Sequence, residues 1–183
     1  PGDYPPLLGS WADVAATGVD TAVDVDPVFD VDGPIEGLPR RMALAAALLD
    51  IDLGTRCISV MHDGYDTHDN QAPRHTELLS ELDEALDVFF TTLSPANAAR
   101  TAVLVISEFG RRVAPSASLG TDHGAAGLAM FMGPSVRGGI RSTPSSLSTL
   151  DARGDQHHTV DFRSVYATVI RDWLGGDDHD VLG

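Results

Sequence analysis

The sequence predicts an α/β fold in which a mainly parallel sheet carries helices on both faces, forming an α/β/α sandwich. Segments with helical periodicity alternate along the chain with short apolar segments, and that alternation is typical of a parallel sheet covered by helices. The segment from Ala102 to Ile106 is also too apolar for a surface strand, which favours burial on both faces. A chain of 183 residues is long enough for one domain with a core, or for part of a larger domain.

Three segments have the pattern of amphipathic helices. Leu38–Leu49 consists of strong helix formers, with Pro39 placed suitably in the first turn. From about Pro73 to Leu93, leucine and phenylalanine recur with a period of about 3.6 residues. The last helix begins after Asp161, whose carboxylate can cap it, and Gly175 is expected to end it.

Three apolar segments are predicted to be strands. Thr55–Met61 contains the β-branched residues Ile58 and Val60, and Gly64 follows it as a breaker. The other two predicted strands are Ala102–Ile106 and Gly127–Met132. Polar residues follow the first two, where ligands bind in open α/β sheets.

Residues 1–36 are predicted to form an irregular acidic segment with one short helix, Leu7–Ala16, and residues 177–183 a tail. Valine alternates with aspartate over residues 19–33, which indicates a half-exposed strand or a linker. The alternative is a calcium loop, whose candidate ligands are Asp24, Asp26, Asp30 and Asp32. The spacing does not match the known loop motif, because Val28 stands where an acid is required.

The charge of the chain excludes two classes of partner. The formal net charge of −15 argues against binding to nucleic acid, because affinity for a phosphate backbone depends on Lys and Arg. The same charge argues against an anionic membrane surface. No apolar run approaches the length of a membrane span.

Acids and histidines follow the predicted strands at positions that indicate a metal site. Asp66 and His68 lie two residues apart after the first strand, Glu108 follows the second, and Asp122-His123 precedes the third. Carboxylate oxygen and imidazole nitrogen together suit Zn²⁺, Mn²⁺ or a similar divalent ion. The alternative for Asp66 is a polar turn in which the carboxylate accepts local hydrogen bonds.

Arg111 and Arg112 follow Glu108 closely, and two roles are open for them. One of them can neutralise the Glu108 carboxylate as a structural partner. Alternatively, their guanidinium groups can bind an anionic substrate, because a guanidinium matches phosphate or sulfate with two hydrogen bonds.

Several motifs in combination resemble one bacterial family. The chain is similar to a domain-of-unknown-function family in several motifs taken together. In order along the chain these are GYDTHDNQ, a helix, VLVISEFGRR, GTDHG followed by an apolar strand, and a C-terminal DFRSVYATVIRDWLG. That family is placed in the alkaline-phosphatase/sulfatase-like superfamily, and the resemblance covers about residues 37–175. It implies an alkaline-phosphatase-like α/β/α sandwich over residues 37–176, with one or two divalent ions at strand ends.

The resemblance also implies roles for individual residues. Asp66, His68, Glu108 and His123 match metal-binding positions, and Asp122 either joins them as a ligand or orients His123; the candidate ions are Zn, Mn, Mg or Ca. Two features depart from the superfamily pattern: Phe109 stands where a metal-binding histidine is usual, and no part of residues 1–36 resembles the strand that carries the nucleophile. The chain therefore resembles the C-terminal half of such a protein, whose N-terminal half would be its partner.

Three functions remain open at this point. The first is a metal-dependent hydrolase of small phosphate or sulfate esters, incomplete because its nucleophile strand is absent. The second is a non-catalytic secreted or surface binding protein with a degenerate metal site. The third is an α/β domain whose acids only satisfy the local backbone. A serine hydrolase is excluded because Ser59, Ser107 and Ser116 lie in no G-x-S-x-G motif. The family resemblance also favours an exported protein.

Overall fold

The computed structural model describes residues 6–29 and 36–183, which belong to two compact units. The first unit contains the chain up to His62 together with residues 80–97. The second unit contains residues 63–79 and residues 98–183. In the described ranges, no helix combines the length and the apolar character that crossing a membrane requires.

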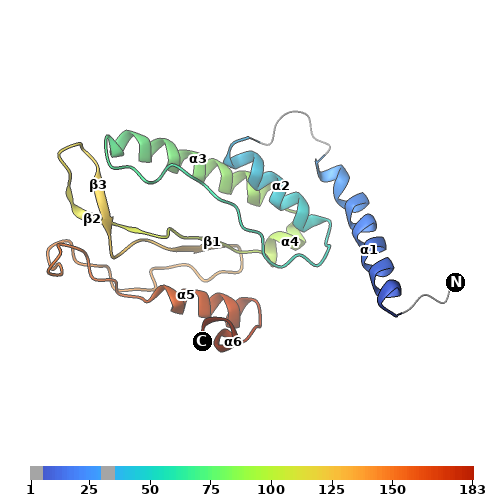
Figure 1. The fold of residues 1–183 in the computed structure, drawn as a ribbon. Coiled ribbons are helices and arrows are strands. Elements are labelled where there is room, and N and C mark those ends of the chain that lie inside the picture. The colour runs from blue at the N-terminus through green and yellow to red at the C-terminus, as the bar shows by residue number, and fades with distance from the viewer. Residues whose placement is uncertain (1–5, 30–35) are drawn as a thin grey trace. The chain divides into compact units, whose positions relative to one another are not determined.

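The first unit is built from helices, which Figure 1 labels α1, α2 and α4, together with the later part of α3. These helices are α1 Pro6–Phe29, α2 Leu38–Asp50, α3 Gln71–Thr92 and α4 Pro95–Ala99. The predicted helices Leu38–Leu49 and Pro73–Leu93 are confirmed to within two residues at each end. The buried apolar residues of this unit lie on α2, on α3 and just after α3: Leu38, Met42, Ala45, Ala46, Ala85, Phe89 and Leu93.

Carboxylates complete the starts of two helices in the first unit. The first backbone N–H groups of a helix have no partner within it, so another group must accept their hydrogen bonds. The Leu38 N–H donates to Glu81 Oε1 at 2.8 Å, and Glu81 lies on α3. Before α4, the Ser94 N–H donates to Asp50 Oδ2 at 2.9 Å and the Ser94 hydroxyl donates to Asp50 Oδ1 at 2.8 Å.

The N-terminal segment differs from its prediction. A single helix, α1, extends well beyond the predicted Leu7–Ala16 and includes Asp24 and Asp26. The predicted half-exposed strand is therefore wrong, because its residues up to Phe29 are helical. Asp30 and Asp32, the other two candidate calcium ligands, lie outside the described residues.

The second unit contains two small antiparallel sheets. Strand β1 Val103–Val105 pairs with β4 Met130–Met132, in a register that places Leu104 opposite Phe131. Strand β2 Gly110–Pro115 pairs with β3 Thr121–Gly124, with Arg111 opposite His123 and an irregularity before Pro115. Figure 1 shows β2 and β3 as neighbouring arrows that continue the chain after β1.

The predicted mainly parallel α/β/α sandwich is wrong. Thr55–Met61, the first predicted strand, forms no ladder with the described residues, and both sheets that exist are two-stranded and antiparallel. The run around Val103–Val105 is half-buried and does not have the burial on both faces that was predicted. Strand preference measures how well a side chain fits beside neighbouring strands, so an apolar run alone does not specify its partner or its direction.

The C-terminal helix begins as predicted. Asp161 caps α5 Phe162–Thr168, its carboxylate accepting a hydrogen bond from the Arg163 N–H at 2.9 Å. The helix continues as a π-helical segment, Val169–Trp173, and ends before Gly175. A further helix, α6 Asp178–Leu182, lies in the predicted tail. The Trp173 ring contacts the Phe131 ring edge to face, with centroids 5.6 Å apart, and so joins this helix to β4.

A candidate metal centre

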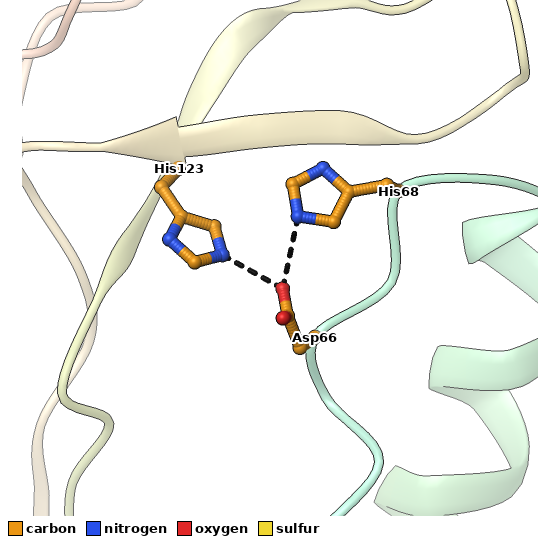
Figure 2. Close-up of side chains that lie close together, drawn as sticks. All are labelled: Asp66, His68 and His123. Carbon is orange, nitrogen blue, oxygen red and sulfur yellow. Dashed lines mark hydrogen bonds and ion pairs between the residues drawn. The ribbon is translucent and has the colours of Figure 1, made fainter.

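Three predicted ligands come together in the second unit: Asp66, His68 and His123. Each offers a ligand atom, and these atoms all lie within 4.8 Å of one another. The Asp66 Oδ1 atom is 2.7 Å from His123 Nε2 and 3.0 Å from His68 Nε2. Figure 2 shows the two imidazole rings directed from separate segments towards this single carboxylate oxygen.

Asp66 and His68 lie in the loop before α3, where the Thr67 N–H donates to the Tyr65 carbonyl at 2.8 Å and so closes a tight turn at Asp66. The residue between them, Thr67, is buried, with only 8% of its surface exposed. Its hydroxyl lies 3.1 Å from His75 Nε2 and also donates to the Tyr65 carbonyl at 3.4 Å. Thr67 thus anchors the loop while its two neighbours face solvent.

His123 comes from β3, and the loop before this strand packs against the backbone of His68. The hydroxyls of Ser116 and Ser118 both donate to the His68 carbonyl, at 3.2 and 2.8 Å. At Gly120 the two segments approach so closely that an added Cβ atom would lie 2.1 Å from the His68 carbonyl oxygen. Only glycine fits at this position.

Backbone hydrogen bonds extend this contact along the two segments. The Asn70 N–H donates to the Ser118 carbonyl and the Gln71 N–H donates to the Leu119 carbonyl, each at 3.0 Å. The Thr121 hydroxyl donates to Gln71 Oε1 at 3.1 Å. The loop that carries Asp66 and His68 is therefore held beside the strand that carries His123.

The electrostatics of the cluster keep the Asp66 carboxyl ionised. The hydrogen bond from His123 lowers the pKa of Asp66 below its usual value, and burial opposes that shift only in part. Electrostatic interactions with His123, His68 and Arg111 lower this pKa further. An ionised carboxylate is the form that ligates a cation.

Asp122 contacts the cluster from the far side of an imidazole. Its Oδ1 atom lies 3.5 Å from His68 Nδ1, while the Nε2 atom of the same ring faces Asp66. Asp122 thus lies on the side of the ring where metal-binding histidines commonly have an outer carboxylate partner.

Glu108 lies outside the cluster. It is exposed between β1 and β2, and it does not belong to the group of convergent ligand atoms found among the described residues. Its neighbour Phe109 makes the closer contact, because the Phe109 ring stacks on the His123 ring with centroids 4.0 Å apart and planes 4° apart.

The two arginines have separate partners. Arg111 donates to the carbonyls of Tyr65 and Thr121, and its NH2 atom lies 3.5 Å from Asp66 Oδ1. Arg112 pairs with the buried Asp155, whose Oδ1 atom lies 3.1 Å from the arginine Nε. Anion binding by either arginine stays a prediction.

Sequence reasoning did not assign functions to Thr67 and Phe109. Thr67 stands directly between two candidate ligands, and that position was a usable signal for it. The place of Phe109 beside His123 had no comparable signal, since it depends on the pairing of β2 with β3.

The donor set fits a divalent transition metal. Two imidazole nitrogens and one carboxylate oxygen are a common combination for Zn²⁺ and related ions, leaving further coordination positions open. Three donors bound tetrahedrally at about 2.1 Å would lie roughly 3.4 Å from one another. The observed contacts of 2.7 and 3.0 Å from Asp66 to the imidazoles are shorter than that spacing, and the three ligand atoms all lie within 4.8 Å of one another.

Comparisons with known proteins give one family match. Searches among curated proteins and among solved structures find no match to this chain. One family model, described as "Protein of unknown function (DUF1501)", matches residues 37–181, which include the whole of the candidate metal centre. Since that match covers most of the sequence, the chain belongs to the DUF1501 family.

Proposed function

We propose that Asp66, His68 and His123 bind one divalent transition-metal ion, and that this metal centre acts on phosphate or sulfate esters. The observation that carries the proposal is the convergence of three ligand atoms within 4.8 Å from two separate chain segments. The ester class comes from the resemblance of the motifs to the alkaline-phosphatase/sulfatase-like superfamily.

The exposure of the cluster supports access by a substrate. The side chains of Asp66, His68 and His123 are 62, 49 and 47% exposed, so a small anion can reach a bound ion directly. A bound divalent ion supplies Lewis acidity towards an ester oxygen or a coordinated water. The chain's own contribution is to hold the two imidazoles and an ionised carboxylate in the geometry described above.

The hydroxyl nearest in sequence to the ligands is not placed for nucleophilic attack. Thr67 lies between Asp66 and His68, but it is buried and its hydroxyl contacts His75 Nε2 and the Tyr65 carbonyl. Its role is to anchor the loop.

A second candidate is a binding protein that holds the metal without catalysis. Two observations favour it: Glu108 lies apart from the convergent ligands, and Phe109 occupies the ring-stacking position beside His123. Each observation makes a second metal ion less favourable, because Glu108 is the acid predicted to bind that ion and Phe109 stands where a metal-binding histidine is usual.

Titration calorimetry with Zn²⁺ and Mn²⁺ tests the metal centre. His68→Ala and His123→Ala are each expected to weaken binding by at least about 100-fold, since even outer partners of metal ligands contribute 10- to 100-fold. Binding should also weaken in acid, because a protonated imidazole cannot ligate a metal. His157→Ala and His158→Ala are matched controls, and each should retain wild-type affinity. Equal affinity in all four variants would indicate diffuse binding to an acidic chain and would overturn the proposal.

Hydrolysis assays test whether the metal-loaded chain is itself an ester hydrolase. The metal-loaded chain is incubated with p-nitrophenyl phosphate and with p-nitrophenyl sulfate, and release of p-nitrophenol is followed. Hydrolysis that His68→Ala and His123→Ala abolish would support the ester hydrolase. Metal binding without hydrolysis of either ester would agree equally with the binding protein and with a hydrolase that lacks its nucleophile strand.

A further inference from the structure

Phe109 and Arg111 form a column of stacked groups with the two histidines of the metal centre. The Phe109 ring lies parallel to the His123 ring at 4.0 Å, and the His123 ring stacks on the His68 ring at 5.1 Å. The Arg111 guanidinium carbon lies 4.9 Å from the centre of the Phe109 ring. A guanidinium at this distance from an aromatic ring is attracted to its face.

The backbone fixes the position of Phe109. The next residue, Gly110, begins β2 and pairs with Gly124. An added Cβ atom at Gly110 would lie 1.8 Å from the Ala126 carbonyl oxygen, so the two segments are in direct backbone contact there. The backbone of Phe109 therefore cannot move away from β3 without breaking the contact between Gly110 and Ala126.

Arg111 connects the two segments that supply the ligands. Its NH2 group donates to the Tyr65 carbonyl at 2.7 Å, and its NH1 group donates to the Thr121 carbonyl. Tyr65 immediately precedes Asp66, and Thr121 is two residues before His123. The same NH2 atom lies 3.5 Å from Asp66 Oδ1, and the Arg111 side chain is only 18% exposed.

A planar guanidinium is needed for this set of contacts. It presents donors in a rigid fork, so it can reach two carbonyls while its face lies near an aromatic ring. A lysine ammonium carries the same charge on a single atom and cannot reproduce that arrangement.

We propose that Phe109 and Arg111 are positioning residues that set the His123 imidazole and the Asp66 carboxylate in register before a metal binds. Phe109 fixes the plane of the His123 ring, and Arg111 holds the Asp66 loop beside β3. The proposal rests on the metal centre inferred above, and it gives Arg111 a role other than binding the anion. Ligands held in advance by supporting contacts bind a metal more tightly than ligands that must first be ordered.

Nuclear magnetic resonance of the metal-free chain tests the positioning role directly. Long-range ¹H–¹⁵N spectra report which ring nitrogen carries the proton, and wild-type His123 should show one tautomer with Nε2–H donated to Asp66. Phe109→Leu and Arg111→Lys are each expected to give mixed or shifted His123 signals. Phe109→Tyr, which retains the stacked ring, should restore the wild-type spectrum.

Zn²⁺ titration of the same variants measures the consequence. Phe109→Leu and Arg111→Lys should weaken Zn²⁺ binding by about 10- to 100-fold, as loss of outer contacts does at other metal sites. Arg112→Lys and Phe90→Leu are the matched controls: Arg112 pairs with Asp155, and Phe90 contacts Phe89 within the first unit. Both controls should bind Zn²⁺ like the wild type.

The outcomes separate this proposal from the proposed function. Unchanged His123 signals in the variants, or unchanged Zn²⁺ affinity in a variant whose circular dichroism matches the wild type, would overturn the positioning role. If Arg111→Lys does not fold, Phe109→Leu decides the test alone. Failure of the wild type to bind Zn²⁺ would overturn the metal centre, and the spectra of the metal-free chain would still decide whether Phe109 and Arg111 position His123.

Discussion

Both compact units contain a carboxylate in contact with the Nε2 atom of a histidine. In the first unit, Glu81 Oε2 lies 3.2 Å from His62. In the second unit, Asp66 Oδ1 lies 3.0 Å from His68 and 2.7 Å from His123. The chemical groups are the same, yet their surroundings differ in ways that assign them different roles.

Both oxygens of the Glu81 carboxylate contact groups of the first unit. Its Oε1 atom accepts the Leu38 N–H at the start of α2, and the His62 side chain is only 12% exposed. The hydrogen bond from Leu38 is the main reason why the pKa of Glu81 lies below its usual value, followed by the one from His62. The pKa of Asp66 is lowered mainly by His123, a side chain that a metal can also use. The two contacts therefore differ in their setting: Glu81 meets one half-buried imidazole within the fold, whereas Asp66 meets two imidazoles in solvent, as the proposed metal centre requires.

Removing the two carboxylates in turn is the strongest test of this comparison. Asp66→Ala should weaken Zn²⁺ binding by at least about 100-fold, because it removes a ligand and not merely an outer partner. Glu81→Ala should leave the affinity unchanged and lower the melting temperature, since the Leu38 N–H loses its acceptor. Calorimetry and thermal unfolding of both variants provide the two measurements. Weakened Zn²⁺ binding in Glu81→Ala to the same degree would break the distinction between the units.

The next largest effect is expected at a second carboxylate of the first unit, Asp50. It accepts hydrogen bonds from the Ser94 N–H, the Ser94 hydroxyl and the amide of the buried Asn97. Asp50→Ala should lower the free energy of unfolding by about 2–3 kcal/mol, because it leaves part-buried donors without an acceptor. Glu84→Ala, an exposed position on α3, is the control and should change it by less than about 0.5 kcal/mol. Urea unfolding at neutral pH measures both.

The same carboxylate makes stability depend on pH. Burial raises the pKa of Asp50, but the hydrogen bonds from Asn97 and Ser94 outweigh it and hold the pKa below the usual value. A lowered pKa in the folded state contributes stability that is fully present above the unfolded value of about 3.9 and is lost as the pH falls through the folded value. The wild type should therefore lose more stability below about pH 4 than Asp50→Ala does. Parallel pH profiles for the two proteins would contradict this assignment.

Three of the described helices, α2, α3 and α5, were predictable because their signals are local. The apolar period over α2 and α3, and Asp161 before α5, each specify a helix from neighbouring residues alone. The sheets were not, because pairing joins distant segments: nothing in Val103–Val105 indicates that it runs antiparallel to Met130–Met132. The valine–aspartate alternation also gave a wrong strand, because a period of two predicts a strand only where a partner strand is available.

The candidate site was predictable in its residues and not in its construction. Asp66, His68 and His123 do converge, as the acid and histidine pattern indicated, but no parallel strand ends bring them together. Hydrogen bonds between the loop before α3 and the loop before β3 do so. Glu108 was included on the parallel-sheet argument and lies outside the cluster in the antiparallel arrangement.

The smallest effect is expected at Leu119 in the second unit, where a substitution should change the stability of the chain without changing its affinity for Zn²⁺. Leu119, in the loop that packs against His68, adopts a left-handed backbone with φ of 62° while its side chain is 74% exposed. This conformation costs a leucine roughly 1–2 kcal/mol. Glycine avoids that cost but loses about 0.5–1 kcal/mol in backbone entropy. Leu119→Gly should therefore stabilise the chain by about 0.5 kcal/mol in urea unfolding, and Zn²⁺ affinity should stay unchanged because no ligand is altered.

Leu128→Gly is the matched control for this strain. Leu128 is equally exposed, and it is not among the described residues that have a positive φ. Glycine there relieves no strain and should only add flexibility to the unfolded chain, so the substitution should destabilise by about 0.5–1 kcal/mol. The opposite signs at two equally exposed leucines are the prediction. If both variants were destabilised alike, the Leu119 backbone would carry no strain.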